Sequence, residues 1–70
     1  MKYLILLEPT KTGFSSYSPD VPGCISTGAT KEETIANMKE AIAFHLEGMV
    51  EDGDELPTTH TIAEYVEIAA

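Results

Sequence analysis

The 70-residue chain has no arginine, no tryptophan and a single cysteine. One cysteine excludes an intramolecular disulfide and a cysteine-rich metal site. Only 4 basic residues oppose 12 acidic ones, which gives a formal net charge of −8 at pH 7. A chain this acidic repels phosphate backbones, and this argues against direct binding of nucleic acid. The acidity has two interpretations, solubility and attraction of a basic partner, and composition does not choose between them.

Long hydrophobic runs are also missing. Five apolar residues, 3–7, come before Glu8, and this run is too short for a signal peptide or a membrane span. We therefore expect a cytoplasmic protein without membrane contact. Hydrophobic residues nevertheless make up 43% of the chain, which predicts a globular core in one domain over residues 1–70. Because so small a domain buries little surface, we expect it to self-associate as a dimer or tetramer.

Hydrophobic patterning predicts four strands. Residues 2–8 are apolar on both faces, which is typical of a central strand covered by a helix on one side and by another subunit on the other. Residues 14–18 form the return strand of a hairpin, and residues 24–27 form a short third strand. The last strand, residues 61–68, carries Ile62, Glu64, Val66 and Ile68 on one face and Ala63, Tyr65 and Glu67 on the other.

The segment before the helix is dense in turn and capping residues. Pro22 and Gly23 fit the central positions of a type II turn, because proline sets a negative φ and glycine tolerates a positive one. Thr30 and Glu33 form a T-x-x-E capping box, in which the Thr30 hydroxyl accepts from an open helical amide and the Glu33 carboxylate accepts in return from the Thr30 amide. These residues are therefore interpreted as architectural.

One helix is predicted over residues 31–51, and Gly53 follows it where a left-handed cap is expected. Its apolar positions recur every three to four residues, which predicts a buried stripe of Ile35, Met38, Ile42, Leu46 and Met49, with Val50 at the edge. The element order is βββαβ. This order indicates an α+β fold, a mainly antiparallel sheet with one helix packed across it.

No catalytic, metal or cofactor site is predicted. Metal-dependent nuclease chemistry needs several converging carboxylates. The acids on or beside predicted strands are Glu8, Asp20 and Glu64. Because acids are abundant in this chain, we interpret these three as solvated side chains and not as metal ligands. The run 51–55 lacks the EF-hand spacing. Cys24 has no basic neighbour to activate it, so a small buried apolar role is favoured. His45 lies beside the apolar stripe and is expected to be packed and hydrogen-bonded.

A contact surface is predicted on the other side of the helix. Phe44 falls almost opposite the apolar stripe, between the small residues Ala41 and Gly48, so its ring is expected to be exposed and available for contact. Acids near the carboxyl end face the negative pole of the helix dipole at a cost of a few tenths of a kcal/mol each. Their retention there favours a basic partner. The candidate partner-binding residues are Phe44, Glu47, Glu51, Asp52, Asp54 and Glu55.

Residues 13–57 resemble the amino-terminal domain of HicB-type antitoxins. The features that carry the resemblance are Gly13 with the following aromatic, Asp20-Val21-Pro22-Gly23-Cys24, Gly28-Ala29-Thr30 with Glu32-Glu33, Leu46, Glu51-Asp52-Gly53 and Pro57. The resemblance implies a partial ribonuclease-H-like fold, oligomers, and a small basic partner, the RNA-cleaving HicA-type toxin. Full-length members carry a carboxy-terminal DNA-binding domain, which we expect to be absent here because the chain continues only two residues past the last predicted strand.

The leading hypothesis is therefore a non-enzymatic antitoxin-like module, without cofactor or metal, that covers the RNA-binding surface of a HicA-type toxin. The first alternative is a solitary oligomeric HicB-like domain that binds another protein or a small ligand. The second is a minimal metal-dependent nuclease. A neighbouring gene for a small basic protein would favour the leading hypothesis, and a metal titration with a nuclease assay would isolate the last.

Overall fold

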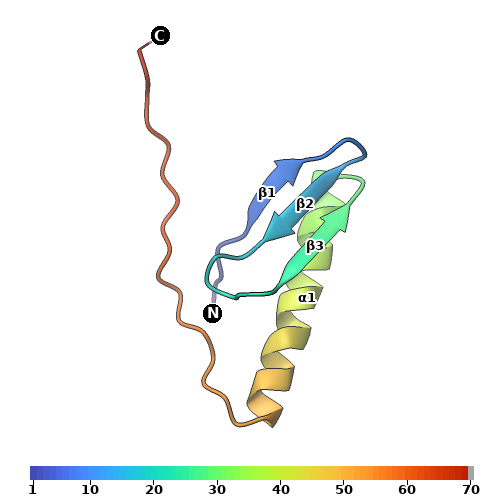
Figure 1. Cartoon of the computed structure of the whole chain (residues 1–70), viewed down its shortest axis with the longest axis vertical. Helices are drawn as coiled ribbons and strands as arrows, with labels where there is room; N and C mark the ends of the chain where they lie inside the picture. Colours follow the sequence, from blue (N-terminus) through green and yellow to red (C-terminus); the bar gives the residue numbers. More distant parts are fainter. Residues whose placement is uncertain (70) are drawn as a thin grey trace.

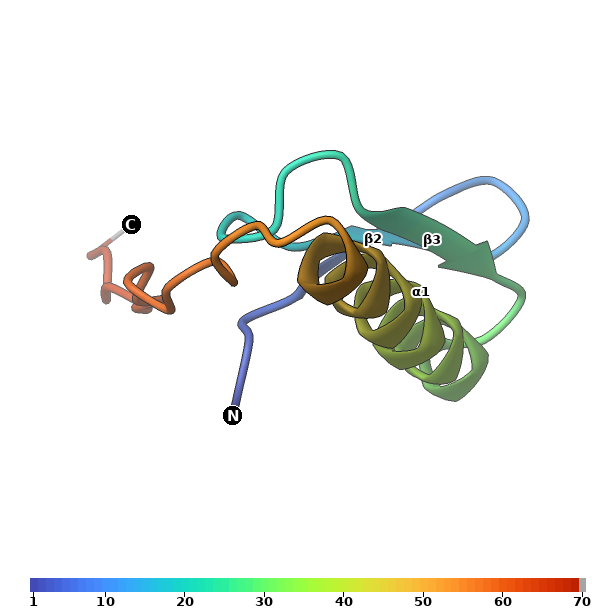
Figure 2. The ribbon, with the colours of Figure 1, turned by 90° about the horizontal axis from the view of Figure 1, so that it is seen from below.

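A computed structural model describes residues 1–69, which form three strands and one helix (Figure 1). The strands β1 (Leu6–Pro9), β2 (Phe14–Tyr17) and β3 (Ile25–Gly28) form an antiparallel sheet in the order β1-β2-β3. The helix α1 (Lys31–Glu51) crosses one face of this sheet, as the view along the layers shows (Figure 2). The predicted α+β class, three antiparallel strands followed by one packed helix, is confirmed.

The hairpin between β1 and β2 pairs Leu6 with Tyr17 and Pro9 with Phe14. The amide of Thr10 donates to the carbonyl of Gly13 at 2.8 Å and closes its turn. The helix is tied to β3 by side chains as well as by packing, since the Asn37 amide group donates to the carbonyl of Thr27 at 2.9 Å. This hydrogen bond adds to the packing of α1 against β3.

The predicted turn and caps are confirmed. Gly23 has a φ of +81°, and the amide of Cys24 donates to the carbonyl of Val21 at 3.3 Å, as a type II turn requires. At the start of α1 the Thr30 hydroxyl accepts from the Glu33 amide at 3.1 Å, which is the first of the two hydrogen bonds of the predicted capping box. At its end Gly53 has a φ of +76°, the left-handed conformation of a glycine cap.

The core lies where the helix crosses the turn after β2. Met38 and Val21 are fully buried, and Cys24 and Ile42 complete the cluster. The predicted stripe is only partly correct, because Ile35 is 38% exposed and Leu46 and Met49 are half-buried. A helix of 21 residues is about 31 Å long, whereas strands of 4 residues span only about 13 Å, so the sheet covers only part of the helix.

The prediction of a fourth strand over residues 61–68 is wrong, because the described residues form a sheet of three strands. Residues 61–69, called the C-terminal arm below, are extended but pair with no strand, and all of them are exposed. Figure 1 shows the arm as an extended segment that is separated from the sheet and continues past it. The radius of gyration is 14.0 Å, against about 11 Å for a compact chain of this length. The physical reason is that a strand needs a partner for its backbone, and the arm has none within residues 1–69.

The prediction that the first strand is central is also wrong. β1 lies at an edge of the sheet, and its outer side has no partner among the described residues. Its two-sided apolar pattern is real, since residues 3–7 are all half-buried. The pattern therefore reports partial cover on both faces of this segment, and it does not specify how many strands pair with its edges.

Candidate interaction surfaces

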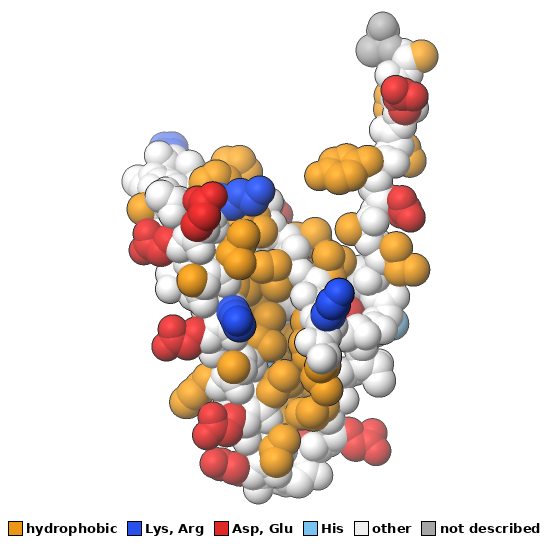
Figure 3. Space-filling view, turned by 180° about the vertical axis from the view of Figure 1, so that it is seen from behind, with side chains coloured by type: hydrophobic (Ala, Val, Ile, Leu, Met, Phe, Trp, Pro, Cys, Tyr) orange, Lys and Arg blue, Asp and Glu red, His pale blue; other side chains and the backbone are white. Residues whose placement is uncertain are grey.

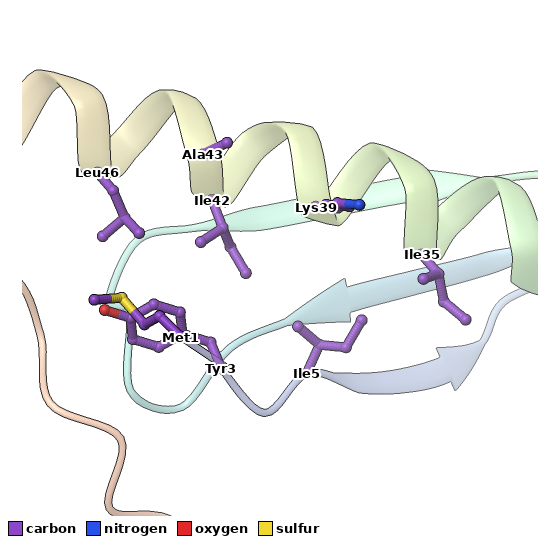
Figure 4. A pocket seen from close by; sticks show the side chains of 8 residues that line it. All are labelled: Met1, Tyr3, Ile5, Ile35, Lys39, Ile42, Ala43 and Leu46. Atoms are coloured by element: carbon purple, nitrogen blue, oxygen red, sulfur yellow. The ribbon is translucent and has the colours of Figure 1, made fainter.

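An open apolar groove runs between the start of the chain and the helix. It has a volume of about 300 Å³ and is lined mainly by Tyr3, Ile5, Ile35, Lys39, Ile42 and Leu46. Figure 4 shows these aliphatic side chains of α1 facing Tyr3 and Ile5 across the groove. Figure 3 shows hydrophobic side chains gathered in a band on this side of the molecule, with lysine side chains beside it and further hydrophobic side chains along the arm.

The Phe44 surface lies on another side of the helix. Phe44 is 79% exposed, as predicted, and a shallow hollow beside it is lined by Asn37, Glu40 and Ala41. A large aromatic ring left in water beside a hollow is a typical anchor for a protein contact. This placement agrees with the sequence-based expectation that the small neighbour Ala41 leaves space next to the ring.

The acidic residues predicted to bind a partner form an exposed group at the carboxyl end of α1. They are Glu47, Glu51, Asp52, Asp54 and Glu55, and each is exposed. The capping hydrogen bonds hold this turn in place, since the Asp54 amide donates to the carbonyl of Met49 at 2.9 Å and the Gly53 amide to that of Val50 at 3.1 Å. No basic residue lies in the last turn of the helix to neutralise them. The structure therefore presents a fixed concentration of negative charge that a basic surface could meet.

The arm begins at an anchor that the sequence did not indicate. Asp20 is buried, and its carboxylate accepts from the Thr61 hydroxyl at 2.6 Å and from the amides of Thr61 and His60 at 3.2 Å each. The hydrogen bond from the Thr61 side chain is the main cause that lowers the pKa of Asp20, and the two amides add to it. A second tie lies nearby, since the Tyr3 hydroxyl donates to the Pro57 carbonyl at 2.8 Å.

Spacing alone could not have found this anchor, because Asp20 and Thr61 are 41 residues apart. The available signal was chemical. An acid between two prolines in a turn needs donors if it is buried, and the Thr-Thr-His-Thr run at residues 58–61 supplies hydroxyls and amides. The interpretation of Asp20 as a solvated acid is therefore wrong, because this carboxylate is buried and holds the root of the arm.

The remaining predicted residues have structural roles or none. Cys24 is a free, buried cysteine in the core, which confirms the apolar interpretation, and burial raises the pKa of its thiol. The prediction that His45 is packed is wrong, because it is exposed on α1; it lies beyond the part of the helix that the sheet covers. Among residues 1–69 no three His, Cys, Asp or Glu side chains come close enough to hold a metal ion. Glu8 is on β1, whereas Glu64 is on the distant arm.

Together these observations define a small α+β domain with an acidic helix end, an exposed aromatic ring and an open apolar groove. Within the described residues no helix combines the length and hydrophobicity that a membrane crossing requires.

The chain belongs to the HicB-like antitoxin family of bacterial toxin–antitoxin systems, whose family model matches residues 3–69. This membership confirms the resemblance inferred from the motifs of residues 13–57. The family is described as one of antitoxins, and this agrees with the expectation that the chain is not an enzyme.

Two relatives are longer than this chain. An uncharacterised 14.9 kDa protein of Haemophilus phage HP1 is 48% identical over 66 residues, which cover 94% of this chain and 50% of that protein. Antitoxin HicB 2 of Photorhabdus laumondii is 34% identical over the whole chain and 51% of its own length. The chain thus spans about half the length of these curated relatives.

Two other comparisons match more of the related protein. A UPF0150 protein of Thermoplasma acidophilum is 33% identical over 81% of this chain and 84% of its own length. A chain of the solved HicA3 and HicB3 toxin–antitoxin complex superposes with a TM-score of 0.72 at 35% identity, covering 86% of this chain and 70% of that one.

Proposed function

We propose that the chain is an antitoxin domain that binds a small basic HicA-type toxin and neutralises it by covering its RNA-binding surface. The observation that carries this proposal is the similarity to a chain of the HicA3 and HicB3 toxin–antitoxin complex, which extends over 86% of this chain. A toxin that cleaves RNA needs a basic surface to hold the phosphate backbone. A partner of opposite charge can occupy that surface and exclude the RNA.

The acidic end of α1 supplies the charge for this contact. Five exposed acids lie within residues 47–55, on a turn held by its capping hydrogen bonds. Complementary charge steers the two proteins together and raises the association rate, more than it lengthens the lifetime of the complex. The acids are therefore assigned to encounter with the toxin.

Phe44 supplies the apolar anchor. Its ring is 79% exposed and borders a hollow on the helix, so contact with a partner would remove most of the ring from water. Truncation of a buried aromatic anchor mainly raises the dissociation rate. The two parts of the surface thus have separable kinetic signatures.

The toxin is first captured from native cells with the tagged chain and identified by mass spectrometry. The test is then the kinetics of its binding to the chain, measured at two salt concentrations. One variant replaces Glu51, Asp52, Asp54 and Glu55 by their amides, which changes the formal net charge from −8 to −4. A matched control makes the same change in charge elsewhere, at Glu8, Glu32, Glu33 and Glu67.

The first variant is expected to associate about tenfold more slowly and with a weaker salt dependence, because screening has less charge to act on. The control is expected to keep most of the parent's rate. Phe44→Ala is expected to shorten the lifetime of the complex. Equal association rates and salt dependences for the two amide variants would refute a local acidic contact, and RNA cleavage unaffected by the bound parent would refute neutralisation.

A further inference from the structure

Within the described residues, the C-terminal arm and the outer edge of β1 each lack a paired strand, and the arm is similar in length to the groove beside β1. The arm has a strand pattern and is fully exposed, with Ile62 at 80%, Val66 at 79% and Ile68 at 74%. β1 is an edge strand that has no neighbour on its outer side within residues 1–69, and residues 3–7, which lead into it, are apolar on both faces. An apolar edge with open backbone groups is a ready template for another strand.

The groove beside this edge fits the apolar face of the arm. Ile62, Val66 and Ile68 lie on one face of an extended segment, and the first and last of them are about 20 Å apart. Along the helix the groove extends from Ile35 to Leu46, a rise of about 17 Å. A strand laid along the outer edge of residues 3–9, the segment that ends in β1, would place alternate side chains over this groove, because Tyr3 and Ile5 line it from that segment (Figure 4).

The charges match as well. The apolar face of the arm carries one charged residue, Glu64, between Ile62 and Val66 in the sequence. The groove lining carries one charged side chain, Lys39, between Ile35 and Ile42 along the helix (Figure 4). The chain has only 4 basic residues. One acid on the arm and one lysine in the groove therefore make the two surfaces complementary in charge.

The arm does not reach this groove within its own chain. Its root is held by three hydrogen bonds to Asp20, and beyond Thr61 the chain runs away from the sheet (Figure 1). We propose that the arm of one copy adds as a fourth strand to the outer edge of residues 3–9 of a second copy, the segment that ends in β1, with Ile62, Val66 and Ile68 over the groove and Glu64 beside Lys39. The exchange is reciprocal, as a two-fold dimer requires.

The first test is sedimentation of the parent and of two arm variants. Val66→Asp places a charge on the face that enters the groove, and Ala63→Asp introduces the same charged residue on the opposite face. Both sites are exposed in the single chain, so neither change disturbs its fold, and far-UV circular dichroism checks this. Because each change counts twice in a two-fold dimer, Val66→Asp is expected to weaken dimerisation at least about 100-fold, and Ala63→Asp to leave it within about threefold.

The second test separates exchange between chains from contact within one chain. Lys39→Glu and Glu64→Lys alone each set like charges together and are expected to weaken the dimer about tenfold. When the two variants are mixed, the arm that carries Glu64→Lys meets the groove that carries Lys39→Glu, which restores an ion pair with its charges reversed. The other arm keeps the native pair, so heterodimers are expected to form with the parent's affinity. Native mass spectrometry resolves them by mass.

Three outcomes would overturn the proposal. They are a parent that stays monomeric well above micromolar concentration, a Val66→Asp variant that dimerises like Ala63→Asp, and a mixture of charge variants without a preference for heterodimers. An arm that becomes protected from hydrogen exchange only when a HicA-type toxin is added would assign the groove or the arm to that toxin instead. None of these results alters the test of toxin binding, which uses the other side of the helix.

Discussion

Replacement of Met38 by alanine tests how the helix is held on the sheet. Met38 is fully buried among Val21, Cys24 and Ile42, so truncation leaves a cavity that the surrounding backbone cannot close. Truncations of this kind cost about 2–5 kcal/mol. A domain of this length has a total stability of roughly 3.5–10 kcal/mol, so the change removes a large part of it.

Val50→Ala on the same helix is the matched control. Val50 is 62% exposed, so removing its two methyl groups loses about 0.5 kcal/mol of burial, and the higher helix propensity of alanine returns a similar amount. We expect no measurable change in stability for this variant. The two truncations thus differ by at least about 2 kcal/mol although both shorten an aliphatic side chain of α1.

The assay is thermal and urea unfolding followed by far-UV circular dichroism, with all variants at one protein concentration because oligomers make Tm depend on it. The unfolding entropy of a chain this short is about 0.15 kcal/mol per kelvin, so 2 kcal/mol lowers Tm by roughly 14 °C. A Met38→Ala variant that unfolds within 3 °C of Val50→Ala would show that the core has been placed on the wrong face of the helix.

Three further predictions concern single residues. Asp20 has a lowered pKa in the folded chain, so its contribution to stability is complete above the ordinary carboxyl pKa and is lost as pH falls through the folded value. The protection factor of the Thr61 amide, which corrects for the intrinsic exchange rate at each pH, should fall in that acidic range, and Asp20→Asn should abolish this pH dependence. Gly23→Ala should destabilise by about 1–2 kcal/mol in urea unfolding because of its φ of +81°, whereas Gly48→Ala, whose new methyl meets no atom within 4 Å, should stabilise by about 1 kcal/mol; equal effects would contradict the turn geometry. Cys24 is buried with a raised pKa, so iodoacetamide should alkylate it at least about tenfold more slowly in the folded chain than in urea, and equal rates would place the thiol at the surface.

Much of the local structure follows from short-range rules. The helix bounds, the Thr30 cap, the Gly53 cap and the turn at Gly23 were all predicted correctly. Each depends on residues within a few positions of one another, where backbone conformation and side-chain chemistry act directly. The exposure of Phe44 and the burial of Cys24 followed from the helical period and from the absence of an activating base.

Other features depended on contacts between distant segments. Ile35 belongs to the apolar stripe, yet it borders an open groove because the three short strands do not extend beneath the whole helix. His45 is exposed for a related reason, since no element covers that part of α1. A helical period gives the direction in which a side chain points, and it does not give the extent of the surface opposite.

The arm marks the boundary between these two kinds of information. Alternation in residues 61–68 correctly indicates a segment suited to a strand, but a strand is completed by a neighbour, and the neighbour is not encoded in the alternation. In the folded chain Asp20 holds the root of the arm through Thr61 and leaves the rest beside an unpaired β1. Local pattern therefore sets what each segment of this protein can become, because conformational preference acts over a few residues. Which segments meet depends on the packing of the whole chain, because burial and hydrogen bonding act between residues that the sequence keeps far apart.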